Sequence, residues 1–448
     1  MQMPPGHREH GEVLRLRKAL YGLRRSPLLW QRHLETGLQA IGFRRVAGEN
    51  CCWQKGSITF FFYVDDCVLA FRRELREAAM TAIRALQQRY HLEGGQDLQW
   101  FLGIEVIRDR SQHKIWLSQA VYCEKAARGI ERSSREPSEG PPTPMTKEEL
   151  LPYDSTASTH EVHDYQVKIG KILYAAVMTR PDIAFAASRL ARFNQNPGPL
   201  HQKAANRTLR YLDSSKHLCL EFGAIPGGSD DTLEVASDAS FADNSLDRRS
   251  SQAFAMKLFG GMIAWRANKQ TTVTTSTTEA ELLALSSAAK EAIFASRLIS
   301  SLQISLPDEH TSAASFASAR RSTPTIRIQC DNTQTVRLVT TELVQLQTKL
   351  RHVDVHNHWL RQAVAEGKVS IDYTPSTEMM ADGLTKSLAK EPFRIFRKQL
   401  NMVDKKELLE KNRRRELAED EQRLEKLLMK EDPWDQLNHV SESQLEAS

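Results

Sequence analysis

The feature that most constrains this chain is the order of strand and helix patterns that begins at Leu233. Three short apolar runs come first: LEVASDAS, QAFAMKLF and MIAWRAN. A long helical pattern over 276–302 follows, and then the strand pattern TIRIQCDN, further helices, the strand pattern KVSIDYTP and a final helix. This order predicts an α/β domain over residues 228–400.

Three aspartates of this region lie where such a domain binds ligands. Asp238 and Asp331 each stand at the end of a predicted strand, and the strand ends of open α/β sheets line the crevice that holds ligands. Asp382 follows the last strand, at the start of a helix, from where a carboxylate can close the same site. We therefore expect the three side chains to converge.

The long helix supplies a fourth carboxylate. Ser276 and Glu279 have the spacing of a capping box, in which the Ser side chain accepts from the third amide and the Glu reaches back to the cap. Glu281 lies two positions further on, about 200° around the helix, and can point toward the sheet edge. We therefore predict Glu281 as the ligand and a structural role for Glu279.

Four convergent carboxylates suit magnesium. Hard oxygen ligands are what Mg²⁺ prefers, and two ions roughly 3.5–4 Å apart can activate a water and stabilise the leaving oxygen of a phosphodiester. The competing interpretation is that each carboxylate is a helix cap or a solvated surface charge, which is the commoner role of a single Asp or Glu. Spacing alone leaves both interpretations open.

Residues 1–130 predict a different arrangement of helices and strands. Amphipathic helices are expected over Pro27–Leu38 and over 74–90. Between them, SITFFFYVDDCVLAF indicates a buried hairpin whose tip carries Asp65 and Asp66. Neighbouring side chains of a strand point opposite ways, so the two aspartates are not expected to act identically.

A linker and a helical region separate these two parts. Residues 131–160 are rich in Ser, Pro, Glu and Gly and predict an exposed linker. Residues 161–227 show two helical patterns, the first broken by Pro181. Arg189 and Arg207 belong to a basic helical face that either contacts phosphates or is simply solvated, and the residues leave both open.

Composition narrows the class of protein. At 448 residues the chain predicts two to four domains, and its net charge of +5 is too small to indicate a partner. Its six cysteines form no C-x-x-C pair, which argues against a disulfide framework or a structural zinc site. With no signal-peptide pattern or membrane-length apolar stretch, we expect an intracellular, cytoplasmic protein without a membrane partner.

Two further segments carry weaker patterns. His352 and His356 have the i, i+4 spacing of a zinc site, but no further ligand is evident, so a polar helix face is the favoured interpretation. A low-complexity insert over 311–322 is expected to loop out, and residues 401–448 form a charged tail predicted to be a solvated helix.

Eight motifs resemble, in order, those of the Pol polyproteins of copia-type LTR retrotransposons, and the resemblance covers roughly residues 3–400. The motifs are KALYGLRRSPLLW (18–30), FYVDD (62–66), FLGIEV (101–106), TRPDIAFAASRLARF (179–193), SDASFAD (237–243), STTEAELLAL (276–285), CDN (330–332) and ADGLTK (381–386). The resemblance implies an α/β and α+β multidomain chain. Its parts would be a partial reverse transcriptase palm with the start of the thumb over 1–130, a helical thumb or connection over 161–227, and a ribonuclease H-like domain with a mixed five-strand sheet over 228–400.

The resemblance also implies the chemistry of the ribonuclease H-like domain. By motif it assigns catalytic and metal-binding roles to Asp238, Glu281, Asp331 and Asp382, the four carboxylates that the pattern indicates. It implies cleavage of the RNA strand of RNA–DNA hybrids with two Mg²⁺ ions, for which Mn²⁺ could substitute. Asp65 and Asp66 would belong to the polymerase centre, with Asp65 the principal metal ligand.

The resemblance implies nucleic acid as the partner, both as RNA–DNA hybrid and as DNA or RNA template–primer. Other Pol segments are further possible partners, and a virus-like particle is a possible location. Tyr63 would lie near the primer end, and Arg248, Arg249, Arg189 and Arg207 are the candidate contacts. The family's polymerase also needs an aspartate upstream of the motif resembling MPPG, so we expect no autonomous polymerase activity from this chain. The alternative to an enzyme is a catalytically silent retroelement remnant that only binds nucleic acid.

Overall fold

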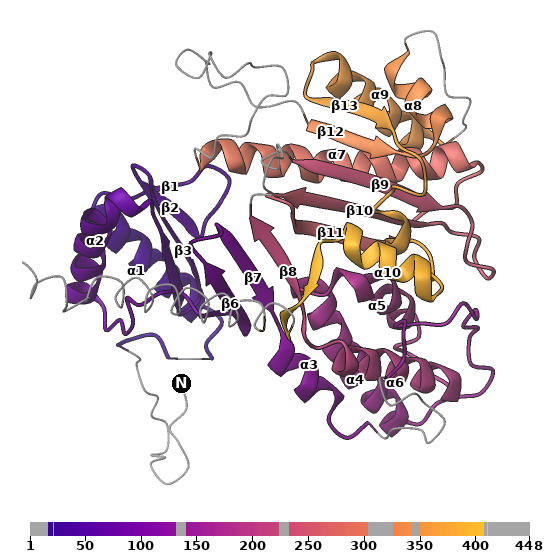
Figure 1. Ribbon diagram of the computed structural model, residues 1–448, viewed down its shortest axis with the longest axis horizontal. Helices are drawn as coiled ribbons and strands as arrows, with labels where there is room; N and C mark the ends of the chain where they lie inside the picture. Colours follow the sequence, from indigo (N-terminus) through magenta and orange to yellow (C-terminus); the bar gives the residue numbers. More distant parts are fainter. Residues whose placement is uncertain are drawn as a thin grey trace, which may run out of the picture. The chain divides into compact units, whose positions relative to one another are not determined.

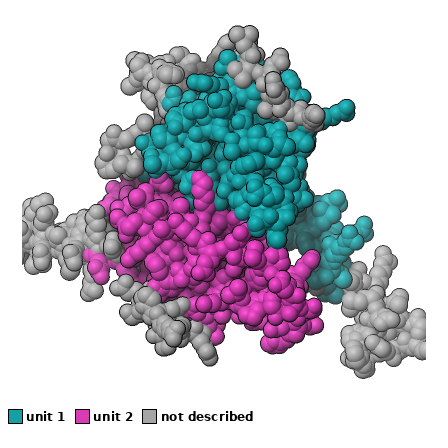
Figure 2. Space-filling model, turned by 90° about the vertical axis from the view of Figure 1, so that its right-hand side faces the viewer, with its two compact units in different colours: residues 1–108, 223–385 teal, residues 109–222, 386–448 magenta. Residues whose placement is uncertain are grey.

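The computed structural model describes residues 17–20, 22–130, 140–223, 233–302, 326–341, 350–406 and 410. The chain divides into two compact units, which Figure 2 colours separately. Unit 1 comprises Met1–Arg108 and Gly223–Thr385, and unit 2 comprises Asp109–Phe222 and Lys386–Ser448. The predicted insert and nearly all of the charged tail lie outside the described residues.

A mixed five-stranded sheet organises the C-terminal part of unit 1. Its order is β11-β10-β9-β12-β13 (Figure 1). The strands are β9 (Glu234–Ser240), β10 (Ser251–Leu258), β11 (Gly261–Lys269), β12 (Ile326–Cys330) and β13 (Val369–Tyr373). The first three pair antiparallel, whereas β12 runs parallel to both β9 and β13. The expected mixed sheet is therefore confirmed.

Helix α7 (Thr277–Ser301) packs along one face of this sheet against β9 and β10. Alanines at positions 280, 284, 288, 289 and 292 are buried on its inner side and let the helix approach closely. The remaining elements are α8 (Thr333–Thr340), α9 (Arg351–Ala365) and the 3₁₀ turn η4 (Asp382–Leu384). Val235, Leu282 and Ile328 are wholly inaccessible in this core, and each such side chain contributes about 1.5–3 kcal/mol.

The N-terminal part of unit 1 has its own core and a four-stranded sheet in the order β1-β2-β3-β4. Its elements are α1 (Ser26–Ala40), β1 (Arg44–Arg45), β2 (Cys52–Lys55), β3 (Ile58–Tyr63), β4 (Asp66–Ala70), η1 (Arg73–Leu75), α2 (Arg76–Arg89), β5 (Trp100–Phe101) and β6 (Ile104–Asp109). Both predicted helices and the hairpin are confirmed. Gly37 of α1 is required by packing, since a Cβ there would lie 2.1 Å from the Tyr90 hydroxyl.

Unit 2 is mainly helical. Its elements are β7 (Lys114–Ser118), α3 (Ala120–Ala127), α4 (Thr159–Met178), η2 (Pro181–Ile183), α5 (Ala184–Ala191), α6 (Pro199–Ser214), β8 (Leu218–Gly223), α10 (Lys390–Gln399) and β14 (Met402–Asp404). The helix break at Pro181 is confirmed. Strand β14 pairs antiparallel with β8, with Met402 opposite Leu220.

The expectation of an exposed linker is wrong for part of that segment. Thr143 and Met145 are buried, and Thr208 of α6 donates its hydroxyl to the Pro144 carbonyl at 3.0 Å. None of the helices among the described residues combines the length and apolar composition needed to cross a bilayer.

Candidate active site

Three of the four predicted carboxylates meet at one edge of the five-stranded sheet. Asp238 comes from β9, Glu281 from α7 and Asp331 from the residue after β12, and one oxygen of each lies within 4.8 Å of the others. Asp238 and Glu281 are buried and Asp331 is half-buried, so the group opens to solvent on the Asp331 side. The strand-end argument therefore finds the right edge of the sheet.

A separate hydrogen bond holds each of these carboxylates. The buried Thr385 hydroxyl donates to Asp238 Oδ2, and the Ser376 hydroxyl donates to Asp331 Oδ2 at 2.6 Å. The backbone amide of Ala239 donates to Glu281 Oε1 at 3.1 Å. These hydrogen bonds fix the orientation of the three carboxylates.

Asp382 is not part of the three-carboxylate group. It begins η4, a single 3₁₀ turn, and its side chain is half-buried. Its backbone carbonyl accepts from the Thr385 hydroxyl at 3.1 Å, and that hydroxyl also contacts Asp238. The fourth predicted ligand is thus connected to the group through Thr385.

The start of α7 differs in one respect from the predicted capping box. The Ser276 hydroxyl accepts from the Glu279 amide at 3.2 Å, as expected. The Glu279 carboxylate, however, accepts from the amide and hydroxyl of Thr275 at 2.6 and 2.8 Å, one residue before the cap. Glu279 therefore has the predicted structural role with a different partner, and Glu281 remains the carboxylate that faces the sheet.

The electrostatics of the group suit a divalent cation. At 4.8 Å, two like charges repel by about 3 kcal/mol at an effective dielectric constant of 20. Burial raises the pKa of the Cys330 thiol, and the nearby carboxylates, Glu281 first, raise it further. Carboxylate oxygens are hard ligands of the kind that Mg²⁺ and Mn²⁺ prefer, so the residues present fit such an ion.

The Asp65–Asp66 pair occupies the tip of the β3–β4 hairpin, where Tyr63 pairs with Asp66. Val64 has φ of 55°, and a β-branched residue in this left-handed region costs about 1–2 kcal/mol. The Trp30 indole donates to the Val64 carbonyl at 2.9 Å and supports the turn. Both aspartates are exposed, and within the described residues they join no group of three possible metal ligands.

The four candidate arginines differ in their surroundings. Arg248 is exposed in the β9–β10 loop, whereas the Arg249 guanidinium lies 3.8 Å from the Asp247 carboxylate. In unit 2, Arg189 lies over the Phe185 ring, and Arg207 is half-buried and donates to the Thr143 hydroxyl at 3.2 Å. Arg248 is therefore the most accessible of the four.

The histidine pair of α9 has a structural explanation. His356 Nδ1 lies 2.8 Å from the Ser286 hydroxyl of α7. Burial lowers the pKa of His356, and Lys290 and then His352 lower it further. Among the described residues these histidines join no group of three possible metal ligands, in keeping with the polar helix face that the sequence favours.

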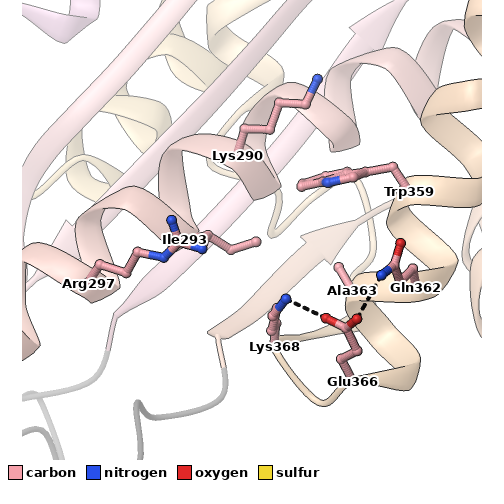
Figure 3. A pocket seen from close by; sticks show the side chains of 8 residues that line it. All are labelled: Lys290, Ile293, Arg297, Trp359, Gln362, Ala363, Glu366 and Lys368. Carbon is pink, nitrogen blue, oxygen red and sulfur yellow. Dashed lines mark hydrogen bonds and ion pairs between the residues drawn. The ribbon is translucent and has the colours of Figure 1, made fainter. Parts of the chain in front are cut away.

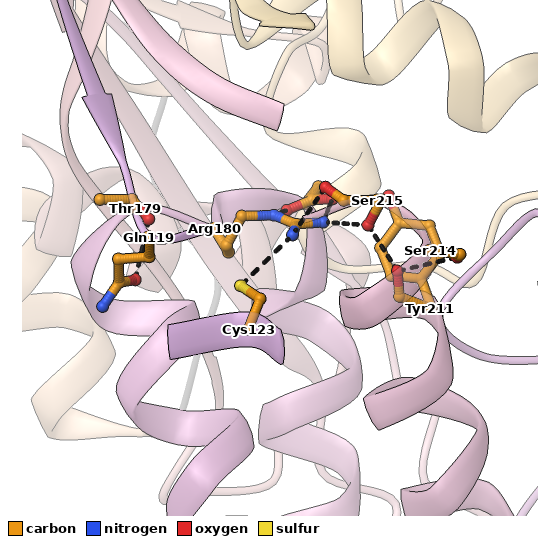
Figure 4. A network of polar contacts seen from close by, with 8 residues as sticks. Gln119, Cys123, Thr179, Arg180, Tyr211, Ser214 and Ser215 are labelled. Carbon is orange, nitrogen blue, oxygen red and sulfur yellow. Dashed lines mark hydrogen bonds and ion pairs between the residues drawn. The ribbon is translucent and has the colours of Figure 1, made fainter. Parts of the chain in front are cut away.

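A buried ion pair in unit 2 was missed by the sequence analysis. Arg180 and Asp182 flank Pro181, are fully buried, and form two hydrogen bonds of 2.7 and 2.9 Å. Tyr211 donates to the same carboxylate at 2.6 Å. Ser215 accepts from Arg180 at 2.7 Å (Figure 4). Burial alone would lower the pKa of Arg180, but Asp182 outweighs it and the net change is upward. The sequence feature that could have indicated this pair is the presence of an Arg and an Asp in the otherwise apolar run around Pro181.

The chain is similar in sequence to known proteins of transposons. A family model described as reverse transcriptase (RNA-dependent DNA polymerase) matches residues 1–144. The Retrovirus-related Pol polyprotein from transposon TNT 1-94 of Nicotiana tabacum is 28% identical over 90% of this chain and 29% of that protein. The putative transposon Ty5-1 protein of Saccharomyces cerevisiae is 31% identical over 65% of this chain and 94% of that protein.

Among solved structures, the foamy viral protease-reverse transcriptase in complex with RNA/DNA hybrid is 13% identical, with a TM-score of 0.41 over 80% of this chain and 39% of that chain. The chain spans between a quarter and three tenths of the length of the first Pol polyproteins that it matches, whose coverage runs from 26% to 29%.

Proposed function

Because the chain belongs to the Pol polyprotein family of copia-type retrotransposons, we propose that its three convergent carboxylates form a ribonuclease H site that cuts the RNA strand of RNA–DNA hybrids. The observation that carries this proposal is the meeting of Asp238, Glu281 and Asp331 within 4.8 Å at the sheet edge. Asp382, which Thr385 connects to the group, is the proposed fourth ligand.

Two Mg²⁺ ions bound there would supply the positive charge that activates a water and stabilises the leaving 3′ oxygen. Asp238 and Glu281 would hold the ions from the buried side, because Thr385 and the Ala239 amide fix their carboxylates. The half-buried Asp331 lies on the open side, where the scissile phosphodiester would enter. The expected products are a 3′-hydroxyl and a 5′-phosphate.

Recognition of the hybrid would depend on its backbone and its 2′-hydroxyls, because side chains cannot read the base edges in the deep, narrow major groove of an RNA-like duplex. Arg248 is the proposed phosphate contact nearest in sequence to β9, and it is exposed. The domain boundaries given by the sequence, with the ribonuclease H-like part at 228–400, are proposed with this function, as is a cytoplasmic location.

The hairpin tip is proposed as part of a polymerase centre. It lies within the region matched by the reverse transcriptase family model, and Asp65 and Asp66 are both accessible to a bound template–primer. The Tyr63 side chain, 60% exposed, precedes the turn and would lie near the primer end.

Cleavage of a labelled RNA–DNA hybrid in Mg²⁺ tests the ribonuclease proposal. Glu281→Gln and Asp238→Asn should each lower the cleavage rate at least about a thousandfold, because loss of a ligand should abolish binding of a metal ion rather than weaken it. Glu291→Gln is the matched control, an exposed glutamate ten residues further along α7, and should cleave at the wild-type rate.

The outcome of that assay also separates the enzyme from its alternative. Hybrid binding by the wild-type chain with no Mg²⁺- or Mn²⁺-dependent cleavage would establish a silent remnant that only binds nucleic acid. Undiminished cleavage by Glu281→Gln would show that the carboxylate group is not the catalytic site.

A further inference from the structure

A pocket lies between α7 and the C-terminal end of α9, on residues that the carboxylate group does not use. Its volume is about 330 Å³, which is at the lower end of the range for small-ligand pockets. Lys290, Arg297 and Lys368 line it together with Glu366 and Trp359, and Figure 3 shows these side chains arranged around the hollow. The pocket is therefore lined by three cations, one carboxylate and one indole.

The charge of this pocket is not balanced by the residues around it. Glu366 already accepts from Lys368 and from the Gln362 side-chain amide, the latter at 2.8 Å. Lys290 and Arg297 are exposed, and within the described part of the chain neither forms an ion pair with a carboxylate; the Lys290 ammonium lies 3.4 Å from His356 Nδ1. Two cations are thus available for an anion that enters the pocket.

The Trp359 indole indicates which class of anion the pocket would bind. The Lys290 ammonium lies over the Trp359 ring, 5.3 Å from its centre, so a positive group and an aromatic ring are in contact. Nucleic-acid strands are commonly held by this combination, since cations bind the phosphates while an aromatic side chain stacks on a base. An acidic peptide would use the cations but has no base to stack.

The pocket lies further along α7 than the carboxylate group and on another side of the helix. Lys290 and Arg297 follow Glu281 by nine and sixteen residues on the same helix. At 1.5 Å and 100° per residue they lie about 14 and 24 Å along the axis and roughly 160–180° around it from Glu281. The pocket is therefore a contact of its own, apart from the carboxylate group.

We propose that this pocket binds a phosphate and an adjacent base of a nucleic-acid strand, as a contact separate from the carboxylate site. Binding here involves none of the carboxylates and no metal ion. The proposal therefore goes beyond cleavage, and it can hold even if the chain does not cleave hybrids.

Binding of a fluorescent oligonucleotide to the full chain in EDTA, over a range of salt concentrations, tests the proposal. Lys290→Gln/Arg297→Gln should weaken binding about tenfold at low salt. It should also reduce the magnitude of the slope of log K against log salt by about 1.4–1.8, the value for two lost phosphate contacts. Trp359→Leu should weaken binding about tenfold, whereas Trp359→Phe should retain most of it because it keeps a stacking surface.

The matched control is Arg76→Gln/Arg84→Gln, which removes the same charge from exposed positions of α2. Its binding and salt dependence should stay close to those of the wild type. An unchanged salt slope in the α7 variant, an equal loss in the control, or displacement by polyglutamate as effective as by unlabelled oligonucleotide would overturn the proposal. Competition by inorganic phosphate alone, equal for wild type and variant, would do so as well. Thermal melts verify that all variants are folded.

Discussion

Each unit holds a cluster of charged groups, and the two clusters differ in sign: opposite charges pair in unit 2, whereas like charges meet in unit 1. In unit 2, Arg180 and Asp182 are fully buried and satisfy each other, with Tyr211 and Ser215 completing the hydrogen bonds. In unit 1, Asp238, Glu281 and Asp331 have the same sign and lie within 4.8 Å of each other, with hydroxyl and amide donors as their observed partners.

This difference separates a structural cluster from a functional one. A buried ion pair with complete hydrogen bonds needs nothing from solution, and removing one partner leaves the other charge uncompensated. A cluster of like charges gains stability only when cations bind, so its energy depends on the medium. Each cluster can therefore be tested through stability.

The largest effect is expected from breaking the ion pair of unit 2. Asp182→Asn should lower the free energy of unfolding by about 3–5 kcal/mol, because Arg180 keeps its charge in a buried site. Urea denaturation measures this, with the exposed Glu391–Arg394 pair as control. Glu391→Gln should cost less than about 1 kcal/mol. A loss of similar size in both variants would show that the buried pair has no special role.

The next effect concerns the dependence of unit 1 on cations. Mg²⁺ at about ten to a hundred times its dissociation constant should stabilise the wild-type chain by about 1–3 kcal/mol. Glu281→Gln should lose most of this gain, and in EDTA it should be at least as stable as the wild type, because it relieves repulsion while its side-chain oxygen can still accept from Ala239. Thermal melts with and without Mg²⁺ measure the stability gained from Mg²⁺ and the stability in EDTA, with Glu291→Gln as control. If Glu281→Gln is much less stable than the wild type in EDTA, the carboxylate group has a structural role like that of the Arg180–Asp182 ion pair.

A smaller effect is expected at Thr385, whose hydroxyl contacts Asp238 and the Asp382 carbonyl. Thr385→Val removes this donor from a buried site and should cost about 1–2 kcal/mol. It should also raise the Mg²⁺ concentration at which the chain is half-stabilised, because Asp238 loses its fixed orientation. Thr385→Ser should restore the wild-type midpoint. If Val and Ser give the same midpoint, Thr385 does not position Asp238.

The smallest effect is a pH dependence within unit 2. Burial lowers the pKa of His201, and its contact with the Leu151 carbonyl offsets this only in part. Because the folded pKa lies below the ordinary value of about 6.5, the neutral ring contributes stability that is present above that value and is lost as pH falls. Denaturation of the wild type at pH 7 and pH 5 should show this loss, and His201→Gln should reduce it. An equal loss of stability between pH 7 and pH 5 in both proteins would exclude His201 as the source.

Much of the candidate site follows from the sequence because it depends on local patterns. The apolar runs around Asp238 and Asp331 define strands, and both residues lie near the strand ends: β9 continues two residues past Asp238, and β12 ends one residue before Asp331. The order of elements brings those ends to one edge. Ser276 marks the start of α7, and counting residues from it separates Glu279 from Glu281. Three candidate ligand positions therefore follow from strand ends and helical periodicity.

The remaining features depend on contacts between distant segments. The sequence shows no partner for Thr385, because its contact with Asp238 joins positions 147 residues apart. Pairing of β14 with β8 joins segments that the sequence gives no reason to align. The burial of Arg180 is equally hidden, since it depends on Tyr211 and Ser215 of another helix end. Long-range packing has no local pattern from which it can be predicted.

The parallel pairing of β9 with β12 has a consequence for synthesis of the chain. Glu234 and Arg327 are hydrogen-bonded neighbours across this pair, although 93 residues separate them. At about 5–20 residues per second, β12 leaves the ribosome roughly 5–20 s after β9. During that interval β10 can cover one edge of β9, but the other edge stays open. The central strand of the domain is thus a nascent-chain edge that a chaperone, or the timing of translation, has to protect from intermolecular pairing.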